Sequence, residues 1–244
     1  MKDLINKTDS ITIGEIVAEN YNAAGVFRKY GMDFCCGGGI TLSKACEKRN
    51  VNADELIHEL EKLGNGVSGN NENYLAWEPE YLIEHIIETH HRFVRNKVDE
   101  ISAYAEKVAR VHGERHPENV EINRTFKDLA REMMDHMEDE EKTVFPLINS
   151  ISTKRKSGGS VGSDEVNELT GQLQLMEDDH EGAGGLMEMI RQQSNDFTPP
   201  AGACATYRIL YQNLKGFEED LHRHVHLENN ILFKKAEKLV GVRK

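Results

Sequence analysis

Apolar residues recur at intervals of three and four over most of the chain, which is the spacing of an amphipathic helix. After Trp77 this spacing continues over four long segments, at about residues 79–112, 120–150, 164–195 and 203–239. Pro117 interrupts the pattern after the first segment, and runs rich in Gly, Ser and Pro interrupt it after the second and third. Four long helices joined by short connections predict an antiparallel four-helix bundle.

Shorter helical patterns precede the bundle and end near Leu63. Asn52 followed three residues later by Glu55 is typical of a capping box and predicts the start of the last short helix. The stretch GNGVSGNNENY comes next, and its glycine and asparagine content without apolar periodicity indicates a linker. We therefore predict an all-α protein with a small N-terminal helical domain at residues 1–65, a linker at 66–78 and the bundle at 79–244.

The composition argues against several classes of protein. A formal net charge of −12 and a pI near 5.4 argue against nucleic-acid binding, because phosphate contacts need clustered Lys and Arg. The sequence has no run of about eighteen apolar residues and no apolar leader, so we expect a cytoplasmic protein that does not enter a membrane. Four cysteines are too few for the disulfide framework of a small secreted domain, which favours reduced thiols.

A ten-residue pattern, His-x3-Glu-x4-Phe, occurs in both the second and the fourth long segments. The two copies are HMEDEEKTVF at residues 136–145 and HVHLENNILF at 224–233. Residues four apart share one face of a helix, so each copy presents an imidazole and a carboxylate together. One such pair is most often an exposed ion pair, whereas two matched copies favour two halves of a metal site.

The first and third long segments each add one histidine to this pattern, His85 and His180. If all six side chains point into the bundle, its interior holds four imidazoles and two carboxylates, and buried charges need compensation by cations. Two ions that share two bridging carboxylates would each receive two imidazoles and two carboxylate oxygens. This donor set suits iron, manganese or zinc, and open bridged pairs are typical of non-haem iron, so we predict iron.

The remaining histidines fit the pattern less well. His90 and His91 follow His85 by five and six residues, which predicts places at the surface or behind the metal ligands. His112 lies near a predicted helix end, where a solvated imidazole is the simpler interpretation.

Two adjacent cysteines, Cys35 and Cys36, lie in the stretch DFCCGGG between two of the short helices. Adjacent cysteines close a disulfide only through a strained ring, so metal ligation or thiol exchange suits them better than a structural bridge. Glycines permit unusual backbone angles and close approach by another molecule. The alternative is that these thiols are small buried apolar groups. We expect Cys46 and Cys204 to have structural roles.

These residues together resemble the repair-of-iron-centres family, bacterial di-iron proteins of nitrosative and oxidative stress, over nearly the whole chain. That family joins an N-terminal domain with a CCGG motif to a hemerythrin-like bundle, and Cys35 to Gly38 match the motif here, with Gly39 as an additional glycine. The resemblance implies a di-iron centre with oxo and carboxylate bridges. The ligands that carry over are His85, His136, Glu140, His180, His224 and Glu228.

The resemblance implies a function in repairing iron-sulfur clusters damaged by nitrosative or oxidative stress. Iron release to iron-sulfur client proteins is one expected activity, with Cys35 and Cys36 in iron transfer or redox exchange. Binding and reduction of nitric oxide at the di-iron centre is a second, which would make the protein an enzyme. The sequence leaves open which activity applies and whether the chain forms a homodimer.

Two other functions compete with repair. A hemerythrin-type protein would bind or sense oxygen without catalytic turnover, although the four imidazoles here would leave both metals more open than the five of hemerythrin. A ferritin-like oxidase would need more carboxylates than the two found here.

Overall fold

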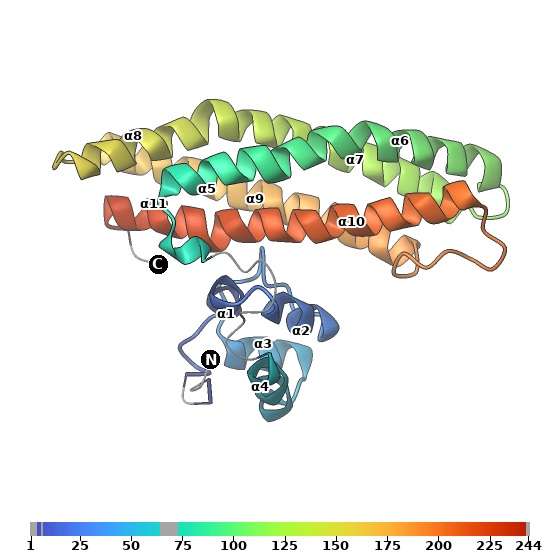
Figure 1. Cartoon of the computed structure of the whole chain (residues 1–244), viewed down its shortest axis with the longest axis horizontal. Helices are drawn as coiled ribbons and strands as arrows, with labels where there is room; N and C mark the ends of the chain where they lie inside the picture. The colour runs from blue at the N-terminus through green and yellow to red at the C-terminus, as the bar shows by residue number, and fades with distance from the viewer. Residues whose placement is uncertain (1–3, 6, 64–72, 243–244) are drawn as a thin grey trace. The chain divides into compact units, whose positions relative to one another are not determined.

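The structure is a computed structural model that describes residues 4, 5, 7–63 and 73–242. Four short helices form the N-terminal part: α1 (Ile13–Glu19), α2 (Ala23–Lys29), α3 (Leu42–Arg49) and α4 (Ala53–Lys62) (Figure 1). Most of the expected linker, residues 66–72, lies outside the described residues, and a single 3-10 turn, η1 (Tyr74–Ala76), follows it.

Side-chain caps explain where three of the short helices begin. The backbone N–H of Thr12 donates to Glu15 while the N–H of Glu15 donates to the Thr12 hydroxyl, which closes a capping box at α1. The Thr41 hydroxyl accepts from the helix α3, and Asn52 accepts from the first turn of α4 at the predicted position. Their apolar faces pack together through fully buried residues such as Phe27.

Each of the four long helices is continuous, and three of them contain a wide π-helical turn. The first consists of α5 (Pro79–His85), η2 (Ile86–His91) and α6 (Arg92–His112); the second of α7 (Glu118–Asp139), η3 (Glu140–Val144) and α8 (Phe145–Lys156); the third of α9 (Ser163–Gln193); and the fourth of α10 (Ala205–Leu227), η4 (Glu228–Leu232) and α11 (Phe233–Val240). The predicted all-α fold and its helical bundle are confirmed, with ends displaced by a few residues.

The π-helical turns coincide with the predicted metal ligands. A π turn accommodates one extra residue, and such turns are frequent at functional sites. Glu140 and Glu228 each begin one of these turns, and His85 directly precedes the third. Each turn changes which side chains point into the bundle on either side of it.

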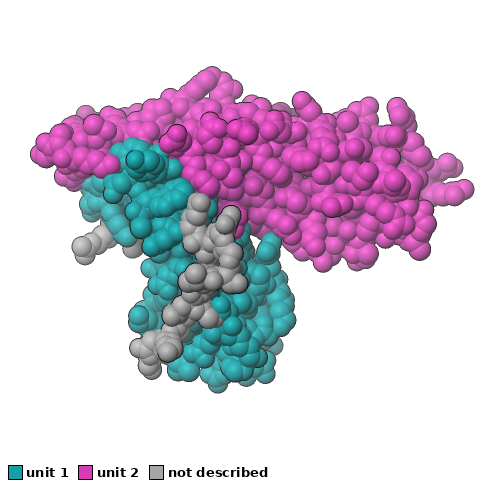
Figure 2. Space-filling model, viewed as in Figure 1, with its two compact units in different colours: residues 1–82, 225–244 teal, residues 83–224 magenta. Residues whose placement is uncertain are grey.

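The described chain divides into two compact units (Figure 2). One unit contains residues 1–82 together with 225–244, and the other contains residues 83–224. The division falls inside the continuous fourth helix, because the end of that helix contacts α1 and the loop that carries the cysteines. The expected boundary at the linker therefore stays a prediction.

In the unit of residues 83–224, α6 contacts α7 and α7 contacts α9. The interior is apolar along most of its length, through side chains such as Ile101, Phe126 and Phe217, which are almost completely buried. No helix in the described part of the chain combines the length and apolar character needed to cross a membrane.

A buried ion pair joins α9 and α10 in the same unit. Arg191 forms two hydrogen bonds to the carboxylate of Glu218, one of them 2.7 Å from Nε to Oε1, and Glu218 is only 2% exposed. Burial lowers the pKa of Arg191, but the bonds and charge of Glu218 outweigh it, so the pKa lies above its ordinary value. The guanidinium therefore stays charged and compensates the buried carboxylate.

We expect Arg191→Met to lower the free energy of unfolding by about 3 kcal/mol, because it removes the cation from a buried carboxylate. Urea unfolding of the metal-free protein measures this change. The double variant Arg191→Met/Glu218→Leu should recover most of the loss, since an apolar pair needs no compensation. A double variant as unstable as the single one would show that shape, and not charge, matters here.

Candidate metal centre

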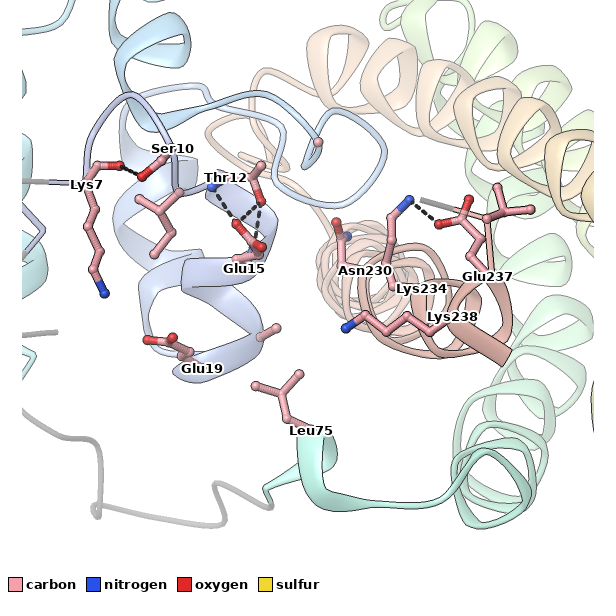
Figure 3. A pocket seen from close by; sticks show the side chains of 14 residues that line it. Lys7, Ser10, Thr12, Glu15, Glu19, Leu75, Asn230, Lys234, Glu237 and Lys238 are labelled. Carbon is pink, nitrogen blue, oxygen red and sulfur yellow. Dashed lines mark hydrogen bonds and ion pairs between the residues drawn. The ribbon is translucent and has the colours of Figure 1, made fainter. Parts of the chain in front are cut away.

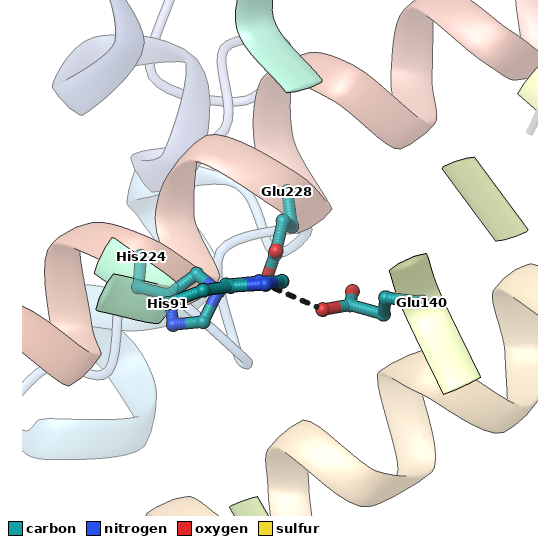
Figure 4. Close-up of side chains that lie close together, drawn as sticks. All are labelled: His91, Glu140, His224 and Glu228. Carbon is teal, nitrogen blue, oxygen red and sulfur yellow. Dashed lines mark ion pairs between the residues drawn. The ribbon is translucent and has the colours of Figure 1, made fainter. Parts of the chain in front are cut away.

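Two groups of buried histidines and glutamates lie inside the bundle, and the ligand atoms of each group lie within 4.8 Å of one another. The first group is His91, Glu140, His224 and Glu228, and the second is His136, Glu140, His180 and Glu228. Glu228 follows His224 by one turn of the continuous fourth helix. Figure 4 shows the four side chains of the first group converging, with the imidazole of His91 facing Glu140.

The structure brings five of the six sequence-predicted ligands into these groups. His85 is the exception, because it lies in neither group. Its Nδ1 instead lies 3.4 Å from the hydroxyl of Thr89, and its ring meets the edge of His90 at 5.8 Å. His91, which the sequence placed at the surface or behind the ligands, occupies the first group in its stead.

The apolar positions of α6 explain why His91 points inward. Val94, Ile101 and Ala105 are fully buried and lie on one face of α6. His91 precedes Val94 by three residues, and positions three apart are neighbours on a helix surface. The π turn from Ile86 to His91 separates His85 from this face. Counting back from Val94, and not forward from His85, would have placed His91 in the interior of the bundle.

The donor set fits metal ions. Glu140 and Glu228 are 0% exposed, and buried carboxylates need cationic compensation. Donor atoms bound side by side at about 2.1 Å from one ion lie about 3.0–3.4 Å apart. The Nε2 atoms of His136 and His180 are 2.9 Å apart, and Oε2 of Glu140 lies 3.2 Å from Nε2 of His91 and 3.4 Å from Nε2 of His136.

Carboxylates contact the Nδ1 atoms of two of these histidines. Nδ1 of His91 lies 2.6 Å from Oε1 of Glu141, which also accepts from Arg95 at 2.9 Å. Burial would raise the pKa of Glu141, but its bonds to His91 and Arg95 outweigh burial and hold that pKa below its ordinary value. The charged carboxylate therefore fixes the tautomer with the proton on Nδ1 and leaves Nε2 to bind metal.

His136 has a similar but weaker partner, because its Nδ1 lies 3.4 Å from the more exposed Asp179. We expect Glu141→Gln to lower iron affinity about 10–100-fold, which is typical of such partners, and Asp179→Asn to have a smaller effect. Competition with a coloured iron chelator measures both. Equal losses of iron affinity in the two variants would contradict the conclusion that the short contact between Glu141 and His91 matters more than that between Asp179 and His136.

His90 is also buried, which excludes the surface place that its spacing allowed. Its Nδ1 lies 2.9 Å from Asp220, and its ring stacks on that of His224 at 5.6 Å with an interplanar angle of 7°. His90 therefore helps to fix the orientation of a predicted ligand from behind.

The two adjacent cysteines form a third group of possible ligands with Asp33. The Sγ atoms of Cys35 and Cys36 lie 3.9 Å apart, and Sγ of Cys35 lies 3.2 Å from Oδ1 of Asp33. The hydrogen bond to Cys36, burial and the charge of Asp33 all raise the pKa of the Cys35 thiol.

The glycines after the cysteines differ in what surrounds them. A side chain at Gly37 would press on Asp33, and one at Gly38 would meet the carbonyl oxygen of Phe34. At Gly39 an added side chain would meet open space. The first two glycines are therefore required by close packing, and the third is not.

The other two cysteines differ from each other. Cys46 is buried, as its expected structural role requires. Cys204 is exposed, with Sγ 3.4 Å from Nε2 of His112, and its expected structural role stays a prediction. His112 lies outside both donor groups.

A hollow of about 1110 Å³ lies between α1 and α11 (Figure 3). Some of its charged side chains have partners nearby: Lys234 with Glu237 at 3.1 Å, and Glu15 with the backbone of Thr12. Among the described residues that line this hollow there is no histidine or cysteine, so it lacks the imidazole and thiolate ligands found at the other two places.

Comparisons with known proteins identify two domains along the chain. Residues 9–64 match a domain of unknown function named for its place at the N-terminus of ScdA, and residues 82–236 match the hemerythrin HHE cation-binding domain. The chain is 35% identical to the iron-sulfur cluster repair protein ScdA of Staphylococcus haemolyticus, over 93% of this chain and 98% of that protein. It is 34% identical to the repair protein YtfE of Escherichia coli O81, over 92% of this chain and 95% of that protein.

A hemerythrin-type cation-binding bundle that follows a smaller helical domain in the sequence is thus the class that fold and site define. Over nearly its whole length, the chain belongs to the family of iron-sulfur cluster repair proteins that includes ScdA and YtfE. A probable iron-sulfur cluster repair protein of Haemophilus influenzae, 32% identical over 91% of this chain and 94% of that protein, is a further relative.

Proposed function

We propose that this protein binds two iron ions in its bundle and supplies iron for the repair of iron-sulfur clusters damaged by nitrosative or oxidative stress. The observation that carries the proposal is a pair of completely buried carboxylates, Glu140 and Glu228, each shared by two groups of imidazoles. Two bridging carboxylates bring two negative charges to a place where only cations can compensate them.

The donor set also favours iron over other ions. Imidazole and carboxylate together suit iron, manganese and zinc, whereas calcium prefers oxygen alone. The relatives are named for the repair of iron-sulfur clusters. Iron is therefore the ion that suits both the donor set of the bundle and the clusters in those names. The same names favour repair over the oxygen-binding alternative.

The residues of this chain have separate tasks in the proposed site. His91 and His224 would hold one ion, His136 and His180 the other, and the two glutamates would bridge them. Glu141 fixes the orientation of His91 through the short bond to Nδ1. The apolar residues around the centre exclude water and strengthen these electrostatic contacts.

Nitric oxide reduction is the second candidate activity. Four protein donors per ion are fewer than the six that iron commonly takes, which favours binding of a small ligand. Two ferrous ions held by these residues would supply the two electrons that the conversion of two nitric oxide molecules and two protons into nitrous oxide and water requires. Gas chromatography of the anaerobic diferrous protein mixed with nitric oxide tests this activity, and a stable nitrosyl without nitrous oxide would exclude it.

Reconstitution of a damaged iron-sulfur enzyme tests the repair function. Iron-loaded protein, mixed anaerobically with an apo iron-sulfur dehydratase, a sulfide source and a thiol, should restore dehydratase activity faster than an equal amount of free ferrous iron. Glu140→Gln protein serves as the matched control, since it should carry little iron. Equal rates for the loaded protein, the variant and free iron would contradict delivery.

Iron-sulfur proteins are the proposed clients, and the cytoplasm is the proposed place of action. Both follow from the relatives named for cluster repair and from the expected reduced thiols.

A further inference from the structure

We propose that Asp33, Cys35 and Cys36 form a separate site for one divalent transition-metal ion, and that the two thiols act as metal ligands and not as exchange nucleophiles. All three residues belong to the unit of residues 1–82 and 225–244. That the ion is ferrous iron rests on the proposed function, whereas the site itself rests on the geometry of the loop.

The positions of the two sulfur atoms fit a shared metal ion. Two thiolates bound to one ion at about 2.3 Å in tetrahedral geometry lie about 3.8 Å apart. The observed separation between the Sγ atoms of Cys35 and Cys36 is 3.9 Å, far beyond the bond length of about 2.05 Å in a disulfide. Oδ1 of Asp33 lies 3.2 Å from Sγ of Cys35, a separation that fits a third ligand beside them.

Hydrogen bonds already hold the loop in this shape. The carboxylate of Asp33 accepts from the backbone N–H groups of Cys35, Cys36 and Gly37 at 2.9–3.1 Å. Asn230 donates to the carbonyl oxygen of Cys35 at 3.0 Å. A preformed loop loses little conformational entropy when it binds an ion, which favours ligation.

The charge beside the thiols distinguishes ligation from exchange. A reactive exchange cysteine usually has a cation or imidazole beside it, because a positive charge stabilises the thiolate. Cys35 has the carboxylate of Asp33 instead, with Oδ1 3.2 Å from its Sγ. A divalent cation attracts this carboxylate and both thiolates together.

The site is accessible within its own unit. Asp33 is exposed and Cys36 is half-buried, so an ion can reach them without unfolding, while Cys35 lies 5% exposed beneath. Binding breaks two S–H bonds and forms two metal–sulfur bonds, and two protons pass to the solvent. No electron is transferred, so the step needs no oxidant or reductant.

Titration of the reduced full-length protein with Co²⁺ under anaerobic conditions tests this site. Thiolate ligation of Co²⁺ gives a charge-transfer absorption band in the near ultraviolet, which imidazole and carboxylate ligation in the bundle does not give. We expect this band in the unaltered protein, with Cys35→Ser and Cys36→Ser each lowering its intensity by about half or more and weakening binding at least about tenfold.

Asp33→Asn should keep the band and weaken binding about 10–100-fold, because the change removes a charge with almost no change in shape. Thermal unfolding of each variant checks that the loop domain still folds. Cys204→Ser and Cys46→Ser are matched controls that should leave the band unchanged, and so should Glu140→Gln in the bundle. Competition with Fe²⁺ should then remove the band.

Several results would overturn the site. They are no band at saturating Co²⁺, a band that survives both serine changes at Cys35 and Cys36, a band lost in Cys204→Ser, or unaltered binding in Asp33→Asn. Failure of the proposed function has a different signature. If the Co²⁺ band is normal but the activity of an apo iron-sulfur enzyme is not restored, the repair function is contradicted and this metal site is not.

Discussion

Glu140→Gln should lose both iron ions, because Glu140 belongs to both donor groups and an amide is a far poorer ligand than a carboxylate. We expect iron affinity to fall more than about 100-fold, beyond the range found for partners that lie behind the ligands. Colorimetric iron analysis after reconstitution and desalting measures the loss. The metal-free variant should also unfold at a higher urea concentration than the unaltered metal-free protein, because it buries one charge fewer.

Glu138→Gln is the matched control for this prediction. Glu138 lies two residues before Glu140 on the same helix, is exposed, and pairs with Lys142. Its loss should leave iron content unchanged. A Glu140→Gln protein that retains two tightly bound ions would show that this carboxylate does not bridge them.

His91→Gln should lose the ion of the first donor group and keep the ion held by His136 and His180. Iron content should then fall from two ions per chain to one, whereas His85→Gln should keep both. The reason is that His91 faces Glu140 at 3.2 Å inside the bundle, while His85 lies in neither donor group. Iron analysis and the Mössbauer spectrum of ⁵⁷Fe-loaded protein measure the difference.

The two variants distinguish the ligand predicted from the sequence spacing, His85, from the one that the structure places in the donor group, His91. Both replace a histidine of the first long helix by the same amide, so general effects of the change on helix stability should be similar. Iron loss in His85→Gln with full retention in His91→Gln would restore the ligand set expected from the sequence alone.

Sequence reasoning succeeded where a signal is periodic and local. The four long helices have apolar stripes over many turns, and His136, Glu140, His224 and Glu228 share a spacing that places each pair on one face. Such patterns depend only on the 3.6-residue repeat of an α-helix, and all four of these predicted ligands lie before or at the point where a π turn begins.

Geometry that departs from that repeat, or that depends on residues far apart in the chain, could not be predicted from the sequence. His91 lies at the end of a π turn, so its direction could not be obtained by counting from His85 with the α-helical angle. The contact between Glu141 and His91 joins residues 50 positions apart, and that between Asn230 and Cys35 joins residues 195 apart. No spacing rule within one segment predicts such contacts.

The position of the iron ions in a crystal of the anaerobically loaded protein tests the account most directly. Anomalous diffraction at the iron absorption edge should give two peaks inside the bundle, one bonded to His91 and His224 and one to His136 and His180, with Glu140 and Glu228 shared. A single peak, a peak bonded to His85, or no peak between these side chains would contradict the account.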